Sequence, residues 1–519
     1  MSEGDDARRR DADGETAGRR DGTATDSSRD GTATDSSRDG TATDTLRDGV
    51  GAVTRRLVEH VPDGVKRKLA GPYNRVQERR ADRAFGARDR PARSPAADAP
   101  QHVVCVVVDA LRADAVDERR TPFLAERTVG SAVTPAPWTF PAVTSLVTGR
   151  YPHEHGAMRQ SDAADRGATD LVVPPTLPDE ELTLPEVFAG AGYRTYGGFA
   201  FHMPFFALGG RFESHALYDD AAADAVLADF TAWFDRHADE RTFSYLHLGD
   251  LHEPVDPPAA YWARHDVDDS IDGISRWRTE RDPDPGPGGE RYRSHRWRLY
   301  RAAADYVDDR LAALHDRVTG RDDVALVVTA DHGEALWEHA ALDAERFVDS
   351  RPAYGVDHGG TPFESVARVP LAVDGLDVER GPGADTAHAS GRDGDWSGGR
   401  PSLIDLAPTL LDALGHPDSL PTTGTSLRDG VPDDRAPLVE AARYGHEKKA
   451  AYLDEWKVVV SRGDEESLGF ALPEETVADL PADVEKRLYD ALPAWPDGEA
   501  PERHVSGMAQ QRLEDLGYV

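Results

Sequence analysis

Continuous apolar runs recur along the chain from about residue 102, and stretches with helical spacing of apolar residues separate them. Such runs are typical of strands that are buried on both faces of a parallel sheet. We predict strands at 103–108, 243–248, 324–329 and 369–373, and helices at 184–191, 221–236, 298–318 and 402–414. The alternation predicts an α/β fold with a mostly parallel sheet sandwiched by helices.

The pattern changes at both ends of this region, which predicts four segments. Residues 1–46 carry a nine-residue repeat with almost no large apolar side chains, so they cannot bury enough surface to offset their ordering entropy and are predicted to be a disordered tail. Residues 47–99 are predicted to form a basic helical arm, and residues 100–432 the main domain, which contains the candidate catalytic residues described below. Past residue 433, an apolar strand at 457–461 and a helical pattern at 484–492 predict a small C-terminal α+β subdomain, 433–519.

The arm has an unusual charge. Residues 47–95 hold 13 Lys and Arg against 6 Asp and Glu, and Val50, Val53, Leu57 and Val61 follow helical spacing. The arm could dock on the acidic body of the protein itself, or it could be a surface helix that makes weak contact with anionic lipid. The short apolar stripe favours docking on the body.

Composition narrows the class of protein. The net charge is −35, with 95 acidic and 60 basic residues, and the predominance of Asp and Arg over Lys resembles adaptation to high salt. This charge argues against nucleic-acid binding. The one cysteine, Cys105, excludes an internal disulfide and a cysteine-based zinc site. No apolar stretch approaches the roughly 18 residues of a membrane helix, and no signal peptide is visible, so we expect a cytoplasmic protein of undetermined oligomeric state.

Three segments carry acid or hydroxyl groups at places suited to chemistry. Asp109 ends the first predicted strand and Asp331-His332 follow the third, at the sheet edge where ligands bind; an adjacent Asp and His can both ligate a divalent metal. Thr139 begins a helical stretch, where free N–H groups and the helix dipole would favour its attack on an anionic ester. Taken alone, Asp109 and Thr139 could equally be helix N-caps.

Other polar residues could assist. His252 and His358 lie in loops after strands and could hold the oxygens of the ester, protonate the leaving oxygen, or complete a second metal site. His247 lies within a strand, where we expect a core histidine. Arg112 and Arg150 are candidates for binding an anionic substrate, with salt-bridge roles as the alternative.

The order of these segments resembles the alkaline phosphatase superfamily, in its sulfatase-like branch, over about residues 100–490. The segments that carry the resemblance are VVDALRAD, WTFPAVTSLVTGRYPHEHG, HLGDLHEP, ADHGEALWEH, RVPLAV and SLIDLAPTLLDALG. The resemblance implies that Asp109, Thr139, Asp331 and His332 bind one or two divalent ions. Zinc or manganese is expected and calcium is compatible. It also implies an anionic ester as the substrate.

The chain departs from the sulfatase pattern at three positions. Thr139 stands where sulfatases have a Cys or Ser that is oxidised to formylglycine, Val143 replaces an Arg, and Ala110 replaces an Asp ligand. Threonine cannot become formylglycine, so the chain looks more like phosphodiesterase and phosphoethanolamine- or phosphoglycerol-transferase members, which implies a phospho-threonine intermediate. We expect a metal-dependent hydrolase or transferase of phosphate esters. The alternatives are a sulfatase acting on a sugar or surface-polymer sulfate, and a non-catalytic ligand-binding relative.

Overall fold

The computed structural model describes residues 63–158, 172–276, 286–320, 323–349, 355–378, 399–495 and 503–504. All of these belong to one compact unit, which begins at Thr54. The predicted tail at 1–46, the helical pattern at 50–61 and most of the Gly/Asp-rich segment at 375–400 lie outside the described residues.

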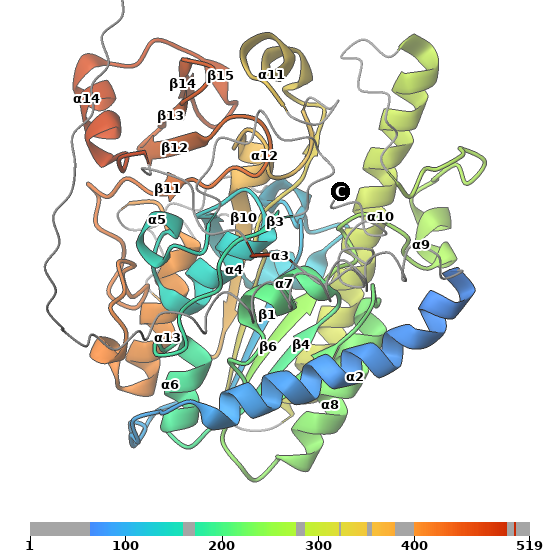
Figure 1. The fold of residues 1–519 in the computed structure, drawn as a ribbon. Helices are drawn as coiled ribbons and strands as arrows, with labels where there is room; N and C mark the ends of the chain where they lie inside the picture. The colour runs from blue at the N-terminus through green and yellow to red at the C-terminus, as the bar shows by residue number, and fades with distance from the viewer. Residues whose placement is uncertain are drawn as a thin grey trace, which may run out of the picture. The chain divides into compact units, whose positions relative to one another are not determined.

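A seven-stranded sheet forms the centre of the fold (Figure 1). In spatial order its strands are β2 (Thr128–Val133), β10 (Arg368–Asp374), β7 (Val324–Thr329), β1 (His102–Val108), β6 (Thr242–Leu248), β4 (Arg194–Phe199) and β5 (Ser214–Leu217). The strands from β7 to β5 pair in parallel. Strand β10 runs antiparallel to both of its neighbours. The predicted fold class, a mostly parallel sheet flanked by helices, is confirmed.

Two groups of helices cover this sheet. Helices α4 (Thr139–Thr148), α6 (Leu184–Gly190), α7 (His202–Leu208) and α13 (Leu406–Leu414) pack together, and so do α3 (Pro122–Arg127), α8 (Ala223–Arg236), α9 (Ala259–Arg264) and α10 (Gly286–Thr319). The short helices α5 (Pro152–His155), α11 (Ala340–Arg346) and α12 (Glu364–Ala367) lie in the connections. Helix α10 starts twelve residues before the predicted position of 298, because its first turns are polar and give no apolar periodicity.

A separate antiparallel sheet follows in the C-terminal part of the chain. It contains β11 (Leu438–Val439), β12 (Lys448–Leu453), β13 (Trp456–Ser461), β14 (Ser467–Ala471) and β15 (Thr476–Val477), with α14 (Ala482–Ala491) packed on β12 and β13. Lys457 joins this sheet to the main body: its buried Nζ donates to the carbonyl of Pro362 at 2.6 Å and pairs with Glu475 at 2.6 Å.

Two small antiparallel sheets of two strands each complete the described structure. One pairs β3 (Val172–Val173) with β16 (Arg503–His504), and the other pairs β8 (Ala335–Leu336) with β9 (Val356–Asp357). The second pair matters for the site, because it places the residue before β8 beside the residue after β9.

Helix α2 (Asp63–Ala87) lies along β5 at the edge of the main sheet. The amide of Asn74 donates to the carbonyl of Leu217 at 3.2 Å, and the N–H of Leu217 donates to Glu78 at 2.9 Å. Ala81 and Phe85, on the same side of the helix, are buried. The described part of the arm therefore packs on the body through apolar and acidic side chains.

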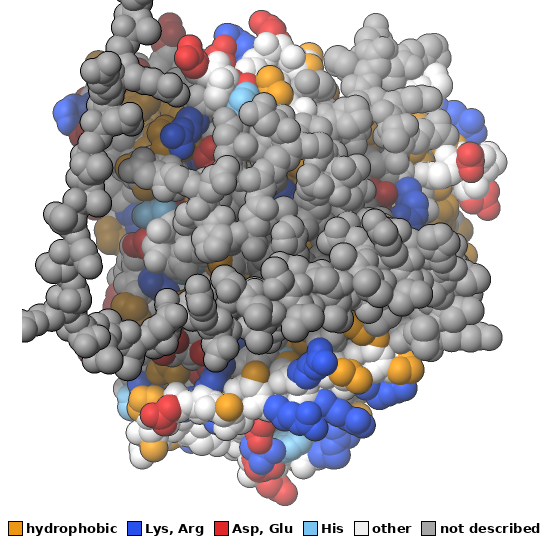
Figure 2. Space-filling view, viewed as in Figure 1, with side chains coloured by type: hydrophobic (Ala, Val, Ile, Leu, Met, Phe, Trp, Pro, Cys, Tyr) orange, Lys and Arg blue, Asp and Glu red, His pale blue; other side chains and the backbone are white. Residues whose placement is uncertain are grey.

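The arginines of α2 point the other way. Arg75, Arg79, Arg80 and Arg83 are exposed and fall on one face at helical spacing. Figure 2 shows Lys and Arg side chains gathered over the region of α2 and α8. Attraction between these arginines and the acidic body is therefore not what holds α2 in place. Lipid contact by this face stays a prediction. None of the described helices is both long and apolar enough to cross a bilayer.

Candidate metal centre and active site

The carboxyl ends of neighbouring strands bring the predicted acid residues together. Asp109 follows β1 directly, and Asp331 and His332 follow β7, which pairs with β1 in parallel. The Nε2 of His332 lies 3.4 Å from Asp331 Oδ2 and 3.6 Å from Asp109 Oδ1. All three side chains are fully buried. The sheet edge therefore holds a compact group of two carboxylates and one imidazole.

Thr139 joins this group from the first residue of α4. Its hydroxyl donates to Asp109 Oδ2 at 3.2 Å and lies 3.3 Å from His332 Nε2. The N-cap residue of α4 is Trp138, in extended conformation, so the N-cap interpretation of Thr139 is wrong. Asp109 is also no cap, because the short helix after it, Ala113–Ala115, has Arg112 as its N-cap residue. Neither side chain is thus engaged in capping a helix.

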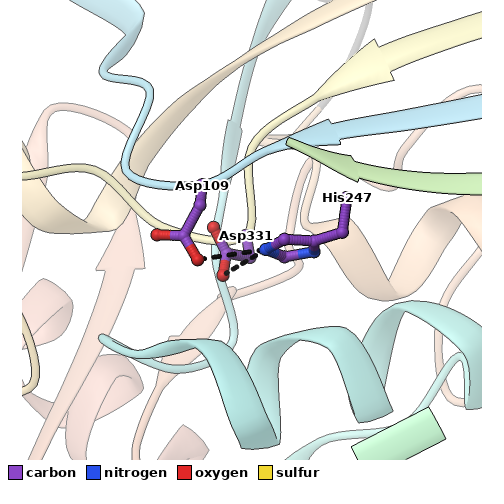
Figure 3. A group of neighbouring side chains, drawn as sticks. All are labelled: Asp109, His247 and Asp331. Atoms are coloured by element: carbon purple, nitrogen blue, oxygen red, sulfur yellow. Dashed lines mark hydrogen bonds and ion pairs between the residues drawn. The ribbon is translucent and has the colours of Figure 1, made fainter. Parts of the chain in front are cut away.

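His247 belongs to the same group, although we expected a core histidine there. Figure 3 shows its imidazole pointing at the carboxylates of Asp109 and Asp331. Its Nε2 lies 3.0 Å from Asp109 Oδ2 and 3.9 Å from Asp331 Oδ2. Residue 247 is the last but one of β6, at the same sheet edge as Asp109. That position was the sequence signal that could have assigned it to the site.

The donor set fits a divalent cation. Asp109 Oδ1 and Asp331 Oδ2 are buried and have no hydrogen-bond partner among the residues that the structure describes. Burial raises the pKa of Asp331, and the charge of Asp109 raises it further. Burial also raises the pKa of Asp109, but the imidazoles of His252, His332 and His247 lower it by more. A cation bound between these buried carboxylates would neutralise their charge and satisfy the two oxygens that have no partner.

The imidazole of His332 is prepared to act as a ligand. Its Nδ1 donates to the carbonyl of Gly333 at 2.8 Å in the neutral tautomer, which directs the Nε2 lone pair toward Asp109 and Asp331. Burial lowers the pKa of His332, which favours the neutral form. A backbone carbonyl on the far nitrogen is the usual way in which proteins orient a metal-binding histidine.

His252 and His358, both predicted from sequence, also reach the site. The His358 ring stacks on that of His332 with 4.2 Å between centroids, and the His252 ring lies 5.1 Å from that of His358. His252 Nδ1 lies 2.7 Å from the carbonyl of Glu253, and burial lowers the pKa of His252 to about 4. The two loop histidines therefore line one side of the group around Thr139.

A second cluster of ligand-type residues adjoins His358. Its Nδ1 lies 2.8 Å from Asp357 and 3.3 Å from Glu334, and these three residues could hold a cation between them. Burial lowers the pKa of His358, but the two carboxylates raise it by more, so it stands well above its ordinary value. Sequence reasoning missed Glu334 and Asp357. Glu334 follows Asp331-His332-Gly333 directly, and the β8–β9 pairing brings it to His358.

Arg112 and Arg150 pair with acidic residues outside the group around Thr139. The buried Arg112 side chain pairs with Asp114 at 2.6 Å and with Glu338, and it donates to the carbonyl of Glu334 at 3.0 Å. Arg150 pairs with Glu181. Both guanidinium groups are thus engaged by carboxylates. Substrate binding by either arginine stays a prediction.

A comparison with models of known protein families identifies the family of this chain. A family model described as sulfatase matches residues 101–416, more than half of the chain. The chain belongs to the sulfatase family. The matched region of this sulfatase-family chain contains every residue of the group around Thr139. A comparison with curated protein sequences finds no match.

Three solved structures resemble this sulfatase-family chain. A protein in complex with its substrate D-glucosamine-2-N,6-O-disulfate is 14% identical, with a TM-score of 0.51, over 75% of this chain and 92% of its own. A 2-O GAG sulfatase is 14% identical, with a TM-score of 0.52, over 76% and 90%. The phosphonate monoester hydrolase of Silicibacter pomeroyi is 16% identical, with a TM-score of 0.50, over 72% and 89%. At these identities the likeness establishes the fold, and the fold alone does not determine the substrate.

Proposed function

We propose that this sulfatase-family chain is a metal-dependent hydrolase or transferase of phosphate esters, with Thr139 as its nucleophile. The observation that carries the proposal is the position of the Thr139 hydroxyl, 3.2 Å from Asp109 Oδ2 and 3.3 Å from His332 Nε2 at the start of α4. A buried hydroxyl beside two metal-type ligands and a helix N-terminus is suited to attack on an anionic ester.

Asp109, Thr139, Asp331 and His332 would hold the divalent ion, for which zinc or manganese is expected and calcium is compatible. When bound, the ion supplies Lewis-acid chemistry: it lowers the pKa of the threonine hydroxyl and neutralises charge on the ester oxygens. Glu334, Asp357 and His358 could hold a second ion.

The side chains of the protein carry out the attack, the stabilisation of the transferring group and the proton transfer. Thr139 Oγ1 attacks phosphorus in line, so the new oxygen–phosphorus bond forms as the bond to the leaving alcohol breaks. His252 and His358 stabilise the transferring group or donate a proton to the leaving oxygen. Water, or an acceptor alcohol in a transferase, then displaces Thr139 from the phospho-threonine and restores the hydroxyl. Arg112 and Arg150 would contribute to substrate binding only by exchanging their carboxylate partners Asp114, Glu338 and Glu181 for the anionic ester.

Sulfate-ester hydrolysis is the second candidate. The family match and the two structural neighbours whose names refer to sulfated substrates favour it. Thr139 weighs against it, because a threonine side chain cannot be oxidised to formylglycine. An assay that compares phosphate and sulfate esters therefore distinguishes the two candidates.

The deciding experiment compares a model phosphodiester and an aryl sulfate as substrates of the full chain, each with zinc, manganese and calcium. We expect phosphodiester turnover that depends on metal and is lost in Thr139→Ala. Thr144→Ala is the matched control, because Thr144 is a buried threonine of the same helix whose hydroxyl donates to Phe140 at 2.8 Å. Near-wild-type turnover in folded Thr139→Ala would overturn the nucleophile, and turnover of the sulfate alone would establish the second candidate.

A further inference from the structure

We propose that His247 is a direct ligand of the cation in this centre and that it makes the site select zinc over calcium. The proposal rests on the metal centre of the proposed function, but not on the ester that the enzyme cleaves or on the role of Thr139 as nucleophile.

The register of the central sheet holds His247 in place. Strand β6 pairs with β1 so that His247 lies opposite Val107 and Leu248 opposite Val108, and the N–H of Asp109 donates to the carbonyl of Leu248 at 2.9 Å. This pairing extends the ladder to the first acid residue of the site. The backbone of His247 is thus held by the pairing of β6 with β1, and its imidazole is fully buried.

The ring nitrogen that faces the site lies close to carboxylate oxygens of both acidic residues. Nε2 of His247 lies 3.0 Å from Asp109 Oδ2 and 3.9 Å from Asp331 Oδ2. Asp109, His247 and Asp331 each offer one donor atom, and these three atoms lie within 4.8 Å of one another. Atoms that share one metal ion at about 2.0–2.2 Å must lie this close to one another. Asp109 Oδ1 and Asp331 Oδ2, without hydrogen-bond partners among the described residues, complete the set.

Residue 110, directly after Asp109, supplies no ligand, because Ala110 is buried and has no side-chain donor. His247 approaches Asp109 from the adjacent strand and brings a donor atom to the same side of the site.

The Tyr245 hydroxyl lies 2.9 Å from His247 Nδ1 and can either accept or donate the hydrogen bond between them, so the imidazole has two possible arrangements. In the ligand arrangement, Nδ1–H donates to the phenol oxygen and the Nε2 lone pair faces the cation. In the other arrangement, the phenol donates to Nδ1, and Nε2–H donates to Asp109 without touching the cation.

The two arrangements have different consequences for metal choice. Imidazole from His247 and His332 beside carboxylate from Asp109 and Asp331 gives a mixed nitrogen and oxygen set, which suits zinc. Calcium takes six to eight oxygen ligands, so a second nitrogen ligand in so small a site disfavours it. A direct role for His247 therefore predicts a strong preference for zinc.

The test measures metal binding, not turnover. The full chain, stripped of metal and loaded with one equivalent of zinc, is compared with His247→Gln by X-ray absorption at the zinc edge and by competition with a chelator. The control is His102→Gln, which removes another buried imidazole, located at the opposite end of β1 and 2.8 Å from Thr242 Oγ1. A calcium titration of each protein measures selectivity.

We expect His247→Gln to lose one imidazole from the zinc shell, to bind zinc at least about 100-fold more weakly, and to lose most of its preference over calcium, while His102→Gln keeps the wild-type shell. An unchanged imidazole count in His247→Gln would overturn the proposal, since loss of an orienting residue alone weakens binding without removing a ligand. If that variant does not fold, the wild type is compared with a variant carrying both His252→Gln and His358→Gln. A single imidazole in the zinc shell of either protein overturns the proposal, and two imidazoles that remain in the double variant support it.

These outcomes are separable from the proposed function. Zinc bound by two imidazoles in a chain that cleaves no phosphate ester would leave the ligand assignment standing and the proposed reaction refuted. If the chain cleaves phosphodiesters but its zinc shell does not change in His247→Gln, the proposed reaction stands and the ligand assignment is refuted.

Discussion

The hydroxyl oxygen of Thr139 lies 3.2 Å from Oδ2 of Asp109, although the two residues are 30 positions apart. The first belongs to the start of α4 and the second to the end of β1. The N–H of Asp109 is bonded to the neighbouring β6, and the indole of Trp138 donates to the carbonyl of Ala441 at 2.7 Å. Both sides of the contact are therefore held by rigid structure, as a preorganised reaction centre requires.

Removing metal should lower the stability of the protein. Without a cation, the buried carboxylates of Asp109 and Asp331 repel each other, and the buried oxygens without partners stay unsatisfied. We expect exhaustive chelation to lower Tm by about 5 °C or more and zinc or manganese to restore it, since an ion that binds only the folded state stabilises it. Differential scanning calorimetry measures both. In Asp331→Asn the chelator should have little effect, and an equal Tm of the wild type with and without metal would contradict the account.

Replacing Arg112 should affect folding. Its guanidinium is buried and donates to the carbonyl of Glu334, but the Asp114 and Glu338 side chains are 54% and 30% exposed, so water can solvate both carboxylates once the arginine is removed. Loss of the buried hydrogen bond and of the ion pairs costs about 1–3 kcal/mol. Arg112→Met should therefore lower the free energy of unfolding in urea by roughly that amount, while the exposed Arg119→Met leaves it within about 0.5 kcal/mol. A folded Arg112→Met protein with unchanged stability and a strongly raised KM would instead establish substrate binding.

Helix α2 should behave as part of the folded body. Phe85, on its inward face, is buried, and Val76, on its outward face, is 45% exposed. Phe85→Ala should lower the free energy of unfolding by about 3–5 kcal/mol, and Val76→Ala should change it by about 0.5 kcal/mol or less. Equal effects of the two substitutions would show that α2 does not pack on β5 in solution.

Asp308 should make stability fall with rising pH in the mildly acidic range. Burial raises its pKa to about 6, although its carboxylate accepts the N–H groups of Phe123 and Leu124 at 3.0 and 2.8 Å. The folded state therefore binds this proton more tightly than the unfolded state, so the contribution is present below the unfolded pKa and is lost as pH rises through about 6.

Asp308→Asn removes that titration. From pH 4 to pH 7, we expect the stability of Asp308→Asn relative to the wild type to rise, by about 1.4 kcal/mol for each unit by which the two pKa values differ. Urea unfolding at a series of pH values measures the difference. A difference that is constant over this range would refute the assignment.

The strands that define the site could be predicted because burial on both faces leaves a plain apolar run, as in β1 and β7. A polar residue directly after such a run lies at the sheet edge where open α/β folds bind ligands, which made Asp109 and Asp331 candidates. Strands β2, β4 and β5 escaped prediction, since they are short or interrupted by glycine and polar residues. The antiparallel direction of β10 also left no local signal, because direction depends on the connections.

The missed site residues have a common cause. His247 looks like any buried histidine until the register of β6 against β1 places it beside Asp109. Glu334 and His358 meet only through the β8–β9 pairing, which joins two-residue strands. Periodicity cannot detect pairs that short. The acidic inward face of α2 was hidden in a similar way by the excess of arginine around it.

The most direct test of the metal centre is anomalous diffraction at the zinc edge from crystals of the metal-loaded chain grown with vanadate. The account predicts an anomalous peak within bonding distance of Asp109, Asp331 and His332, with vanadate bonded to Thr139 Oγ1. A zinc-loaded crystal in which these side chains surround no anomalous peak, or in which vanadate binds away from Thr139, would contradict it.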